Sequence, residues 1–401
     1  MDFDTLRMDF PTVRNGAGIY LDSACQALRP DCVIRAMDEY YGDYPACGGR
    51  SVHSMASRVS LAVDETREAL ASFFGTDDPG CYVFTKNCTE GLNTAAFGLG
   101  LKKGDTVITT DSEHNSNHIP WLILQENAGI RRKYSRSAED GSFDIEFFKG
   151  LFDSSVRAVS VQQSNSVTGQ TLPVREIAEI ARDYNAVVII DGAQSAPHIP
   201  VDLKKIDADI FCFSIHKMPG PSGMGVMYGK KEVLENLNPV FGGGGTVGLV
   251  TYDSFTPAPV PDRFEAGLQN YAGIIGTKAA LDYLSGIGMD NIRKHDSELM
   301  RRMMGNLEDI RNLHILGSSV PENHGSILSF NIDGLKPHDI AMMADSMKGI
   351  MIRSGMHCSH PFYVSRHIGG SARASVYLYN NIAEIDAFTD TVRHIADVFG
   401  E

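Results

Sequence analysis

The chain has 401 residues and an ordinary globular composition, 43% hydrophobic and 21% charged. Its 50 acidic residues outnumber the 36 basic ones, and the net charge of −14 argues against nucleic acid as a partner, because phosphate binding needs a basic surface. No stretch is long and apolar enough to span a bilayer, and the acidic, mixed N-terminus is unlike a signal peptide, so we expect no membrane association and a cytoplasmic location.

The first two thirds of the chain alternate strand and helix patterns. Short apolar runs predict strands over residues 82–85, 106–110, 158–163, 186–190, 209–214 and 225–228. One helical pattern begins at Thr89. A second follows the second strand and runs through Trp121, and a third covers residues 173–184 after the third strand. Strands that alternate with helices predict a mainly parallel sheet covered on both faces.

A loop region and a second kind of pattern follow. Residues 242–245 are all glycine and three prolines stand between 257 and 261, which predicts a long loop of the kind that is often functional. Beyond residue 272 the patterns predict helices over 273–285, 289–307, 337–347 and 382–399, and a strand over 326–331. This part is typical of a smaller α+β domain, and the length of the chain agrees with more than one domain.

The cysteines are spread along the chain and are odd in number. They are Cys25, Cys32, Cys47, Cys81, Cys88, Cys212 and Cys358. Because no pair has C-x-x-C spacing, the sequence favours free thiols in a reducing compartment, with a metal site as the less favoured alternative.

The segment Ser214-Ile215-His216-Lys217 ends the fifth predicted strand. A lysine at a strand end, followed by Met-Pro-Gly-Pro-Ser-Gly, is oddly placed for a solvated surface lysine. The glycines and prolines fix the backbone and let a ligand approach closely. Taken alone, the segment fits a ligand-binding lysine and a loop lysine without a role equally well.

Asp191 follows the apolar residues 187–190, and an acid at the carboxyl end of a parallel strand points into the crevice where α/β sheets bind ligands. Lys217 lies 217 − 191 = 26 residues further on, about one strand–helix–strand excursion. The pair is what pyridoxal phosphate chemistry requires, a lysine for the Schiff base and an acid for the pyridinium nitrogen. Asp191 also fits a helix N-cap, and the two roles can coexist.

Two further segments carry weaker signals. Thr85-Lys86-Asn87-Cys88-Thr89-Glu90-Gly91 lies between a strand and a helix, where a helix start with hydroxyl donors suits a phosphate but is also common capping chemistry. Arg353-Ser354-Gly355-Met356-His357-Cys358, with Arg373 downstream, fits either a thiol of lowered pKa near carboxylate-binding arginines or, as we would favour from this segment alone, an inert buried cysteine.

Together and in this order, the segments resemble the class V branch of the fold-type I pyridoxal-phosphate enzymes, and most of all the cysteine desulfurase and selenocysteine lyase group with a short catalytic loop. The resemblance runs from residue 20 to nearly the C-terminus. Further matching stretches are Tyr20-Leu21-Asp22-Ser23-Ala24, Glu113-His114-Asn115-Ser116-Asn117, Ser164-Asn165-Ser166-Val167-Thr168-Gly169, Phe264-Glu265-Ala266-Gly267 and Arg373-Ala374-Ser375.

The resemblance implies the fold, an α/β fold-type I PLP-dependent transferase. A large cofactor-binding domain with a mainly parallel sheet would cover residues 20–270. A smaller α+β C-terminal domain over 271–401 would carry the catalytic cysteine loop, and an N-terminal segment over 1–19 would pack with that small domain.

The resemblance also assigns roles around the cofactor, pyridoxal 5'-phosphate. The positions that match are Lys217 for the Schiff base and for proton transfer at the substrate Cα, Asp191 for the pyridinium nitrogen, Gln194 for the ring oxygen, His114 for the ring face, and Thr89, Ser214 and His216 for the phosphate. His114 has the alternative of an ordinary buried histidine.

Around the substrate, the resemblance implies that Asn165 and Arg373 orient the carboxylate, with Arg353 nearby. Cys358 stands where the family carries its sulfur-accepting thiol, and His114 and His357 are the candidate proton carriers beside it. No metal is implied.

The chain departs from the family pattern at several positions. Leu268 replaces a threonine that reaches the phosphate of the partner subunit, and leucine cannot donate that hydrogen bond, so Thr246 or a backbone group takes over or the grip is weaker. Met356 stands where a histidine is common. Cys25 and Cys47 are unusual, and no mechanism for them follows from the sequence.

The reaction implied is that of a homodimeric cysteine desulfurase, which converts L-cysteine to L-alanine and passes sulfur from a Cys358 persulfide to a sulfur-acceptor protein, for iron–sulfur cluster or thionucleoside synthesis. The alternatives are a selenocysteine lyase or another class V aminotransferase or lyase on a small amino acid, because a fold does not fix a function. An aminotransferase needs no nucleophilic thiol, so Cys358 discriminates. A non-catalytic regulatory or scaffold protein is disfavoured by the presence of Lys217, Asp191 and His114.

Overall fold

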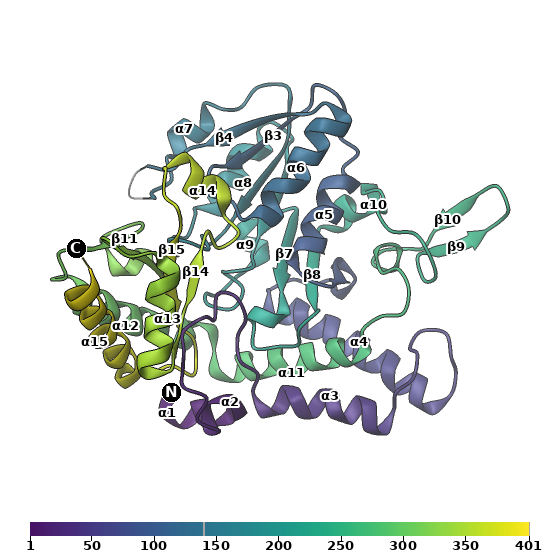
Figure 1. Cartoon of the computed structure of the whole chain (residues 1–401). Coiled ribbons are helices and arrows are strands. Elements are labelled where there is room, and N and C mark those ends of the chain that lie inside the picture. The colour runs from purple at the N-terminus through teal and green to yellow at the C-terminus, as the bar shows by residue number, and fades with distance from the viewer. Residues whose placement is uncertain (139–140, 401) are drawn as a thin grey trace.

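The computed structural model describes residues 1–138 and 141–400, and its centre is a seven-stranded sheet (Figure 1). In spatial order the strands are β2 (Tyr82–Thr85), β8 (Gly225–Gly229), β7 (Ile210–Ser214), β6 (Val187–Asp191), β5 (Val156–Gln162), β3 (Thr106–Thr110) and β4 (Arg131–Ser135). β8 runs antiparallel to both of its neighbours, and the other neighbouring pairs are parallel. The prediction of a mainly parallel α/β sheet is confirmed.

Helices cover both faces of this sheet, because successive strand side chains point to opposite sides. Ile190 and Phe213 face one hydrophobic core, and Ile189 and Ile210 face the other. The helices that complete the two cores are α4 (Ser54–Phe73), α8 (Val174–Arg182) and α11 (Tyr271–Ile287) on the first face, and α5 (Cys88–Gly98) and α6 (Asn115–Ala128) on the second. This burial on both faces explains the near-continuous apolar runs in the strands.

A smaller antiparallel sheet lies beside the large one. Its strands, in spatial order, are β11 (Leu313–Ile315), β12 (Ile327–Ile332), β15 (Ser371–Ser375) and β14 (Arg353–Gly355). They share a core with helices α12 (Met289–Leu307), α13 (Pro337–Lys348) and α15 (Ile382–Phe399). The predicted α+β character of this part is confirmed.

The N-terminal residues contact the smaller sheet's side of the molecule. β1 (Ile19–Tyr20) pairs in parallel with β13 (Ile350–Met351), and the ring of Phe3 stacks on His295 with 3.8 Å between centroids. α11 in turn packs against α3 (Asp31–Asp43) and α4. The division at residues 19/20 and 270/271 stays a prediction. Among the described residues, none of the helices combines the length and the apolar character needed to cross a membrane.

Not every element was predicted from the sequence, and two of the elements that were missed have a clear physical reason. β4, with the sequence Arg-Arg-Lys-Tyr-Ser, was not predicted because it lies at an edge of the sheet and carries charges rather than an apolar run. The stretch predicted as a long loop holds the hairpin of β9 (Val247–Val250) and β10 (Phe255–Pro257), which projects from the body in Figure 1. Its side chains are largely exposed, so its sequence lacks the alternation of apolar and polar residues that predicts a half-buried strand.

Candidate active site

The ends of β6 and β7 and the starts of α5 and α6 surround one pocket of about 230 Å³. Asp191 is the last residue of β6, Ser214 is the last of β7, and Lys217 ends the 3-10 turn that follows. Carboxyl ends of neighbouring parallel strands meet at the same sheet edge, which is where α/β folds bind ligands. The expected closeness of Asp191 and Lys217 follows from this topology.

All but one of the predicted site residues line this pocket. They are Thr89, His114, Asp191, Gln194, Ser214, His216, Lys217, Arg353, Cys358 and Arg373. The exception is Asn165, whose side-chain oxygen accepts the backbone N–H groups of Val167 and Thr168 at 2.7 and 3.0 Å. Its neighbours Ser164 and Ser166 line the pocket. The role of Asn165 at the substrate therefore stays a prediction.

Lys217 and Asp191 influence each other's charge inside the pocket. Removal from water lowers the pKa of the Lys217 amine, while the Asp191 carboxylate opposes that shift. Burial also raises the pKa of Asp191, and the N–H of Ala193 and the charge of Lys217 counteract this effect. An amine that gives up its proton readily is suited to bond a carbonyl group and then to carry protons.

The start of α5 and the end of β7 form a corner rich in hydrogen-bonding groups. The backbone N–H of Cys88 donates to Oγ of Ser214 at 2.9 Å, and the hydroxyls of Thr89 and Ser116 lie 2.7 Å apart. Burial lowers the pKa of His216 to about 4, so its ring is neutral at neutral pH. Hydroxyls and backbone N–H groups at a helix start suit a phosphate.

Three buried polar atoms of the pocket residues have no hydrogen-bond partner among the residues that the structure describes: Oε1 of Gln194, Nε of Arg373 and Nδ1 of His357. Gln194 donates through Nε2 to the Ala24 carbonyl at 2.9 Å, but its Oε1 accepts nothing. Arg373 is only 3% exposed, and its Nε has no acceptor. Buried polar groups are nearly always paired, so Oε1 of Gln194 offers an acceptor and Nε of Arg373 offers a donor to a polar ligand.

Two further histidines of the pocket are neutral. Burial, with the charge of Lys217, lowers the pKa of His114 to about 3. Its Nδ1 accepts the backbone N–H of Ser116 at 3.1 Å, which leaves the ring proton on Nε2. Burial also lowers the pKa of His357 far below its ordinary value. Its Nε2 lies 3.1 Å from the Ser371 carbonyl oxygen, which can accept only an N–H, so the bare nitrogen is Nδ1.

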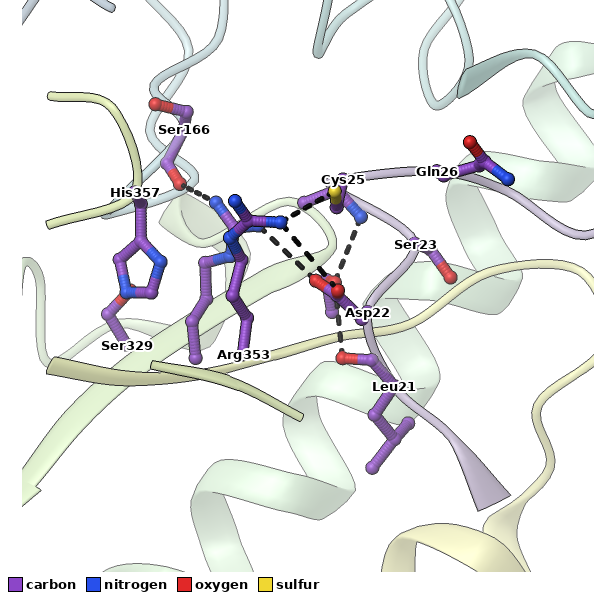
Figure 2. A network of polar contacts seen from close by, with 12 residues as sticks. Leu21, Asp22, Ser23, Cys25, Gln26, Ser166, Ser329, Arg353 and His357 are labelled. Atoms are coloured by element: carbon purple, nitrogen blue, oxygen red, sulfur yellow. Dashed lines mark hydrogen bonds and ion pairs between the residues drawn. The ribbon is translucent and has the colours of Figure 1, made fainter. Parts of the chain in front are cut away.

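The two arginines face one carboxylate from paired strands, and Figure 2 labels Arg353 and the Asp22 carboxylate. Arg353 on β14 lies opposite Arg373 on β15 in the strand register. Arg373 donates through Nη1 to the Ser166 carbonyl at 2.9 Å, and its Nη2 lies 3.5 Å from Oδ1 of Asp22. Arg353 Nη1 lies 3.9 Å from the other oxygen of Asp22. Two guanidinium groups and one carboxylate leave one positive charge for an anion.

Sequence reasoning missed two residues of this cluster, Asp22 and Cys25. The Cys25 thiol lines the pocket and accepts from Nη1 of Arg353 at 2.6 Å, as Figure 2 shows. Burial raises the pKa of Asp22, and the two arginines lower it. The sequence signals were weak: Asp22 lies within a stretch that resembles the family, and Cys25, just beyond that stretch, stood out only as unusual.

The loop that carries Cys358 has an unusual backbone. His357 and Cys358 have φ angles of +47° and +57°, and Gly355 has +114°. The Cys358 carbonyl accepts the backbone N–H of Asn115, next to His114, while the residue itself is exposed and also lines the pocket. The thiol-bearing residue therefore reaches both the pocket and the solvent, contrary to the buried, inert cysteine that the segment alone favoured.

Comparison with known proteins places these features in a family context. Residues 19–388 match the family model described as aminotransferase class-V. A probable cysteine desulfurase of Synechocystis sp. is 38% identical over 99% of this chain and 96% of its own length. A cysteine desulfurase of Haloferax volcanii is 34% identical over 100% of this chain and 98% of its own.

Solved structures agree with the sequence relatives. The apo structure of cysteine desulfurase from Thermococcus onnurineus NA1 superposes with a TM-score of 0.94 at 34% identity, over 98% of both chains. The cysteine desulfurase CsdA from Escherichia coli superposes with a TM-score of 0.92 at 30% identity, over 100% of this chain and 99% of the other. The similarity thus extends over the whole of the sheet, the pocket and the cysteine loop.

Proposed function

The chain belongs to the aminotransferase class-V family, and from that premise we propose that it is a pyridoxal-phosphate-dependent cysteine desulfurase, which converts L-cysteine to L-alanine and takes up the sulfur as a persulfide on Cys358. One observation carries the proposal: a solvent-exposed cysteine lines the same pocket as the Lys217–Asp191 pair and the carboxylate-seeking Arg373.

The pocket fits the cofactor. Lys217 would hold pyridoxal phosphate covalently through its ε-amine, and Asp191 would pair with the ring nitrogen. The unpaired Oε1 of Gln194 would accept from the ring hydroxyl, which is the kind of donor this buried oxygen lacks. His114 would lie on the ring face, and the phosphate would be held by Thr89, Ser214 and His216 at the start of α5. When bound, this cofactor withdraws electrons from the substrate Cα and stabilises the charge that forms there.

The protein side chains then divide the remaining work. Arg373, with its unpaired Nε, would grip the substrate carboxylate, and Arg353 would add charge beside it. Lys217 would take the Cα proton and return it later, as its lowered pKa allows. The Cys358 sulfur would bond to the substrate sulfur while the substrate carbon–sulfur bond breaks. A persulfide on this exposed loop would be open to a sulfur-acceptor protein.

The direct test is to incubate purified protein with cysteine and cofactor and to measure alanine and sulfide. We expect alanine in every turnover, with sulfide released only when a reductant or an acceptor removes the persulfide sulfur. Pyruvate and ammonia without alanine would instead indicate a lyase, and a keto acid that keeps the sulfur, formed without ammonia, would indicate an aminotransferase.

Arg373→Lys tests the carboxylate grip. Lysine keeps the positive charge but loses the planar fork that binds two oxygens, so the KM for cysteine should rise about 10- to 100-fold. The absorbance of the bound cofactor should not change, because Arg373 does not hold the cofactor. Arg353→Lys is the matched comparison. If KM rises only in that variant, the carboxylate is bound by Arg353.

We also propose that the protein is a homodimer in the cytoplasm. A groove of about 980 Å³ lies between residues 47–50 and 244–268, and Leu268 beside it is 75% exposed. The nearby hairpin exposes Leu249, Tyr252 and Phe255. The hydroxyl of Thr246 donates to the Gly243 carbonyl at 2.9 Å within its own turn, so it is already engaged.

The proposed location in the cytoplasm is supported by the cysteines. All seven are free, which suits a reducing compartment.

Sedimentation at micromolar concentration should give the mass of two chains. The double substitution Tyr252→Ser and Phe255→Ser removes apolar hairpin side chains, so it should raise the dimer dissociation constant at least about tenfold. Tyr184→Ser, at an exposed tyrosine two residues beyond the end of α8, is the control. A fully active wild-type monomer would refute the proposal.

A further inference from the structure

Cys88 is a buried thiol directly behind Asp191. It is the first residue of α5 and is 4% exposed. Its Sγ lies 3.3 Å from Oδ1 of Asp191 and 3.2 Å from the carbonyl oxygen of Cys212, the strand partner of Asp191 on β7. Its backbone N–H donates to Oγ of Ser214. One residue therefore contacts both the acid at the ring nitrogen and the corner where the phosphate would lie.

The contacts of Asp191 are divided unevenly between its two oxygens. Oδ1 accepts the backbone N–H of Ala193 at 2.9 Å as well as the Cys88 thiol. Within the described part of the chain, all hydrogen bonds of this side chain fall on Oδ1. With both donors on one oxygen, the carboxylate cannot rotate freely, and Oδ2 is the oxygen left for a ligand.

The direction of the Cys88 hydrogen bond follows from its surroundings. Burial, with the nearby charge of Asp191, raises the pKa of the Cys88 thiol well above its ordinary value, so the sulfur keeps its proton and is a donor. Its two possible acceptors are a neutral carbonyl and a carboxylate. A charged acceptor makes the stronger hydrogen bond, so the S–H turns to Asp191 whenever Asp191 is ionised.

We propose that Cys88 is a positioning residue for the cofactor: its thiol donates to Oδ1 of Asp191, which keeps that carboxylate ionised and presents Oδ2 to the ring nitrogen. The inference rests on the proposed function, since it concerns pyridoxal phosphate in this pocket. The competing explanation is that Cys88 merely fills space in the hydrophobic core that it shares with Leu92 and Ile189.

The two explanations differ in what serine and alanine do at position 88. Both are smaller than cysteine and nearly equal in volume, but only serine donates a hydrogen bond. With protein loaded with cofactor labelled with ¹⁵N in the ring, the nitrogen signal should move toward the unprotonated position in Cys88→Ala. It should stay near the wild-type position in Cys88→Ser. The alanine variant should also lose about tenfold in kcat, and the serine variant should recover most of that loss.

Cys212→Ala is the matched control, because Cys212 is an equally buried thiol of the same core whose side chain does not donate to Asp191. It should leave the ring nitrogen signal unchanged. If either small side chain prevents folding, Cys88→Thr and Cys88→Val repeat the comparison with larger, equally shaped side chains.

Identical ring nitrogen signals in the donor and non-donor variants would overturn the inference, as would a shift in Cys212→Ala equal to that in Cys88→Ala. The signal is read without cysteine. A protein that binds the cofactor but fails to form alanine would therefore contradict the proposed function and leave the role of Cys88 intact.

Discussion

Cys358→Ala should bind the cofactor and cysteine normally, yet form alanine at least about 10³-fold more slowly than the wild type. The reason is that the other pocket thiols do not replace it. Cys88 stays protonated behind Asp191, and Cys25 is engaged with Arg353. No other group on the loop has a sulfur placed to accept sulfur from the substrate except the thioether of Met356, which carries no proton to lose.

The measurement combines alanine formation with peptide mass analysis. Wild-type protein that receives cysteine without reductant should carry one additional sulfur atom on the peptide containing Cys358. Cys47→Ala, which removes another exposed cysteine, should behave as the wild type. If Cys358→Ala forms alanine at the wild-type rate, sulfur does not pass through this thiol, and the lyase and aminotransferase reactions become the better explanations.

Lys217→Ala should lose all covalent attachment of the cofactor and about 10³-fold or more of the activity. Lys217 is the lysine that lines the pocket, and the carboxylate of Asp191 is close enough to oppose the lowering of its pKa. Treatment of the wild type with a hydride reductant should fix the cofactor on the peptide that contains Lys217.

In the same experiment, Lys217→Arg distinguishes the positive charge of Lys217 from the ability of its amine to bond the cofactor. Its guanidinium preserves the positive charge beside Asp191 but cannot bond the cofactor aldehyde, so it should be as inactive as the alanine variant. A reduced adduct on any other lysine, or comparable activity in the arginine variant, would contradict the assignment.

Residues that end strands were the easiest to predict. Asp191 and Lys217 follow apolar runs, and parallel strand ends necessarily gather at one sheet edge, so their closeness needed no knowledge of packing. The resemblance to a family then supplied roles for His114, Gln194 and the arginines. Most of the central strands were found for the same reason, since burial on both faces leaves an unmistakable apolar run.

Contacts between segments that lie far apart in the chain could not be predicted from the sequence. Cys25 meets Arg353 across 328 positions, and Cys88 meets Asp191 across 103. Helix and strand periodicity relates only residues a few positions apart, so no local sequence pattern predicts either contact. The exposed hairpin and the charged β4 were missed for a different reason, because a strand that buries little surface leaves little hydrophobic pattern.

The left-handed backbone of His357 and Cys358 has an energetic consequence. A residue other than glycine gives up roughly 1–2 kcal/mol in that region compared with an ordinary conformation. A movement of the loop out of the pocket would let both residues recover this energy. The N–H of Asn115 and the ring contacts of His357 oppose the movement. A sulfur acceptor of the kind proposed above would therefore have to supply less binding energy to extract the thiol than the loop contacts alone would demand.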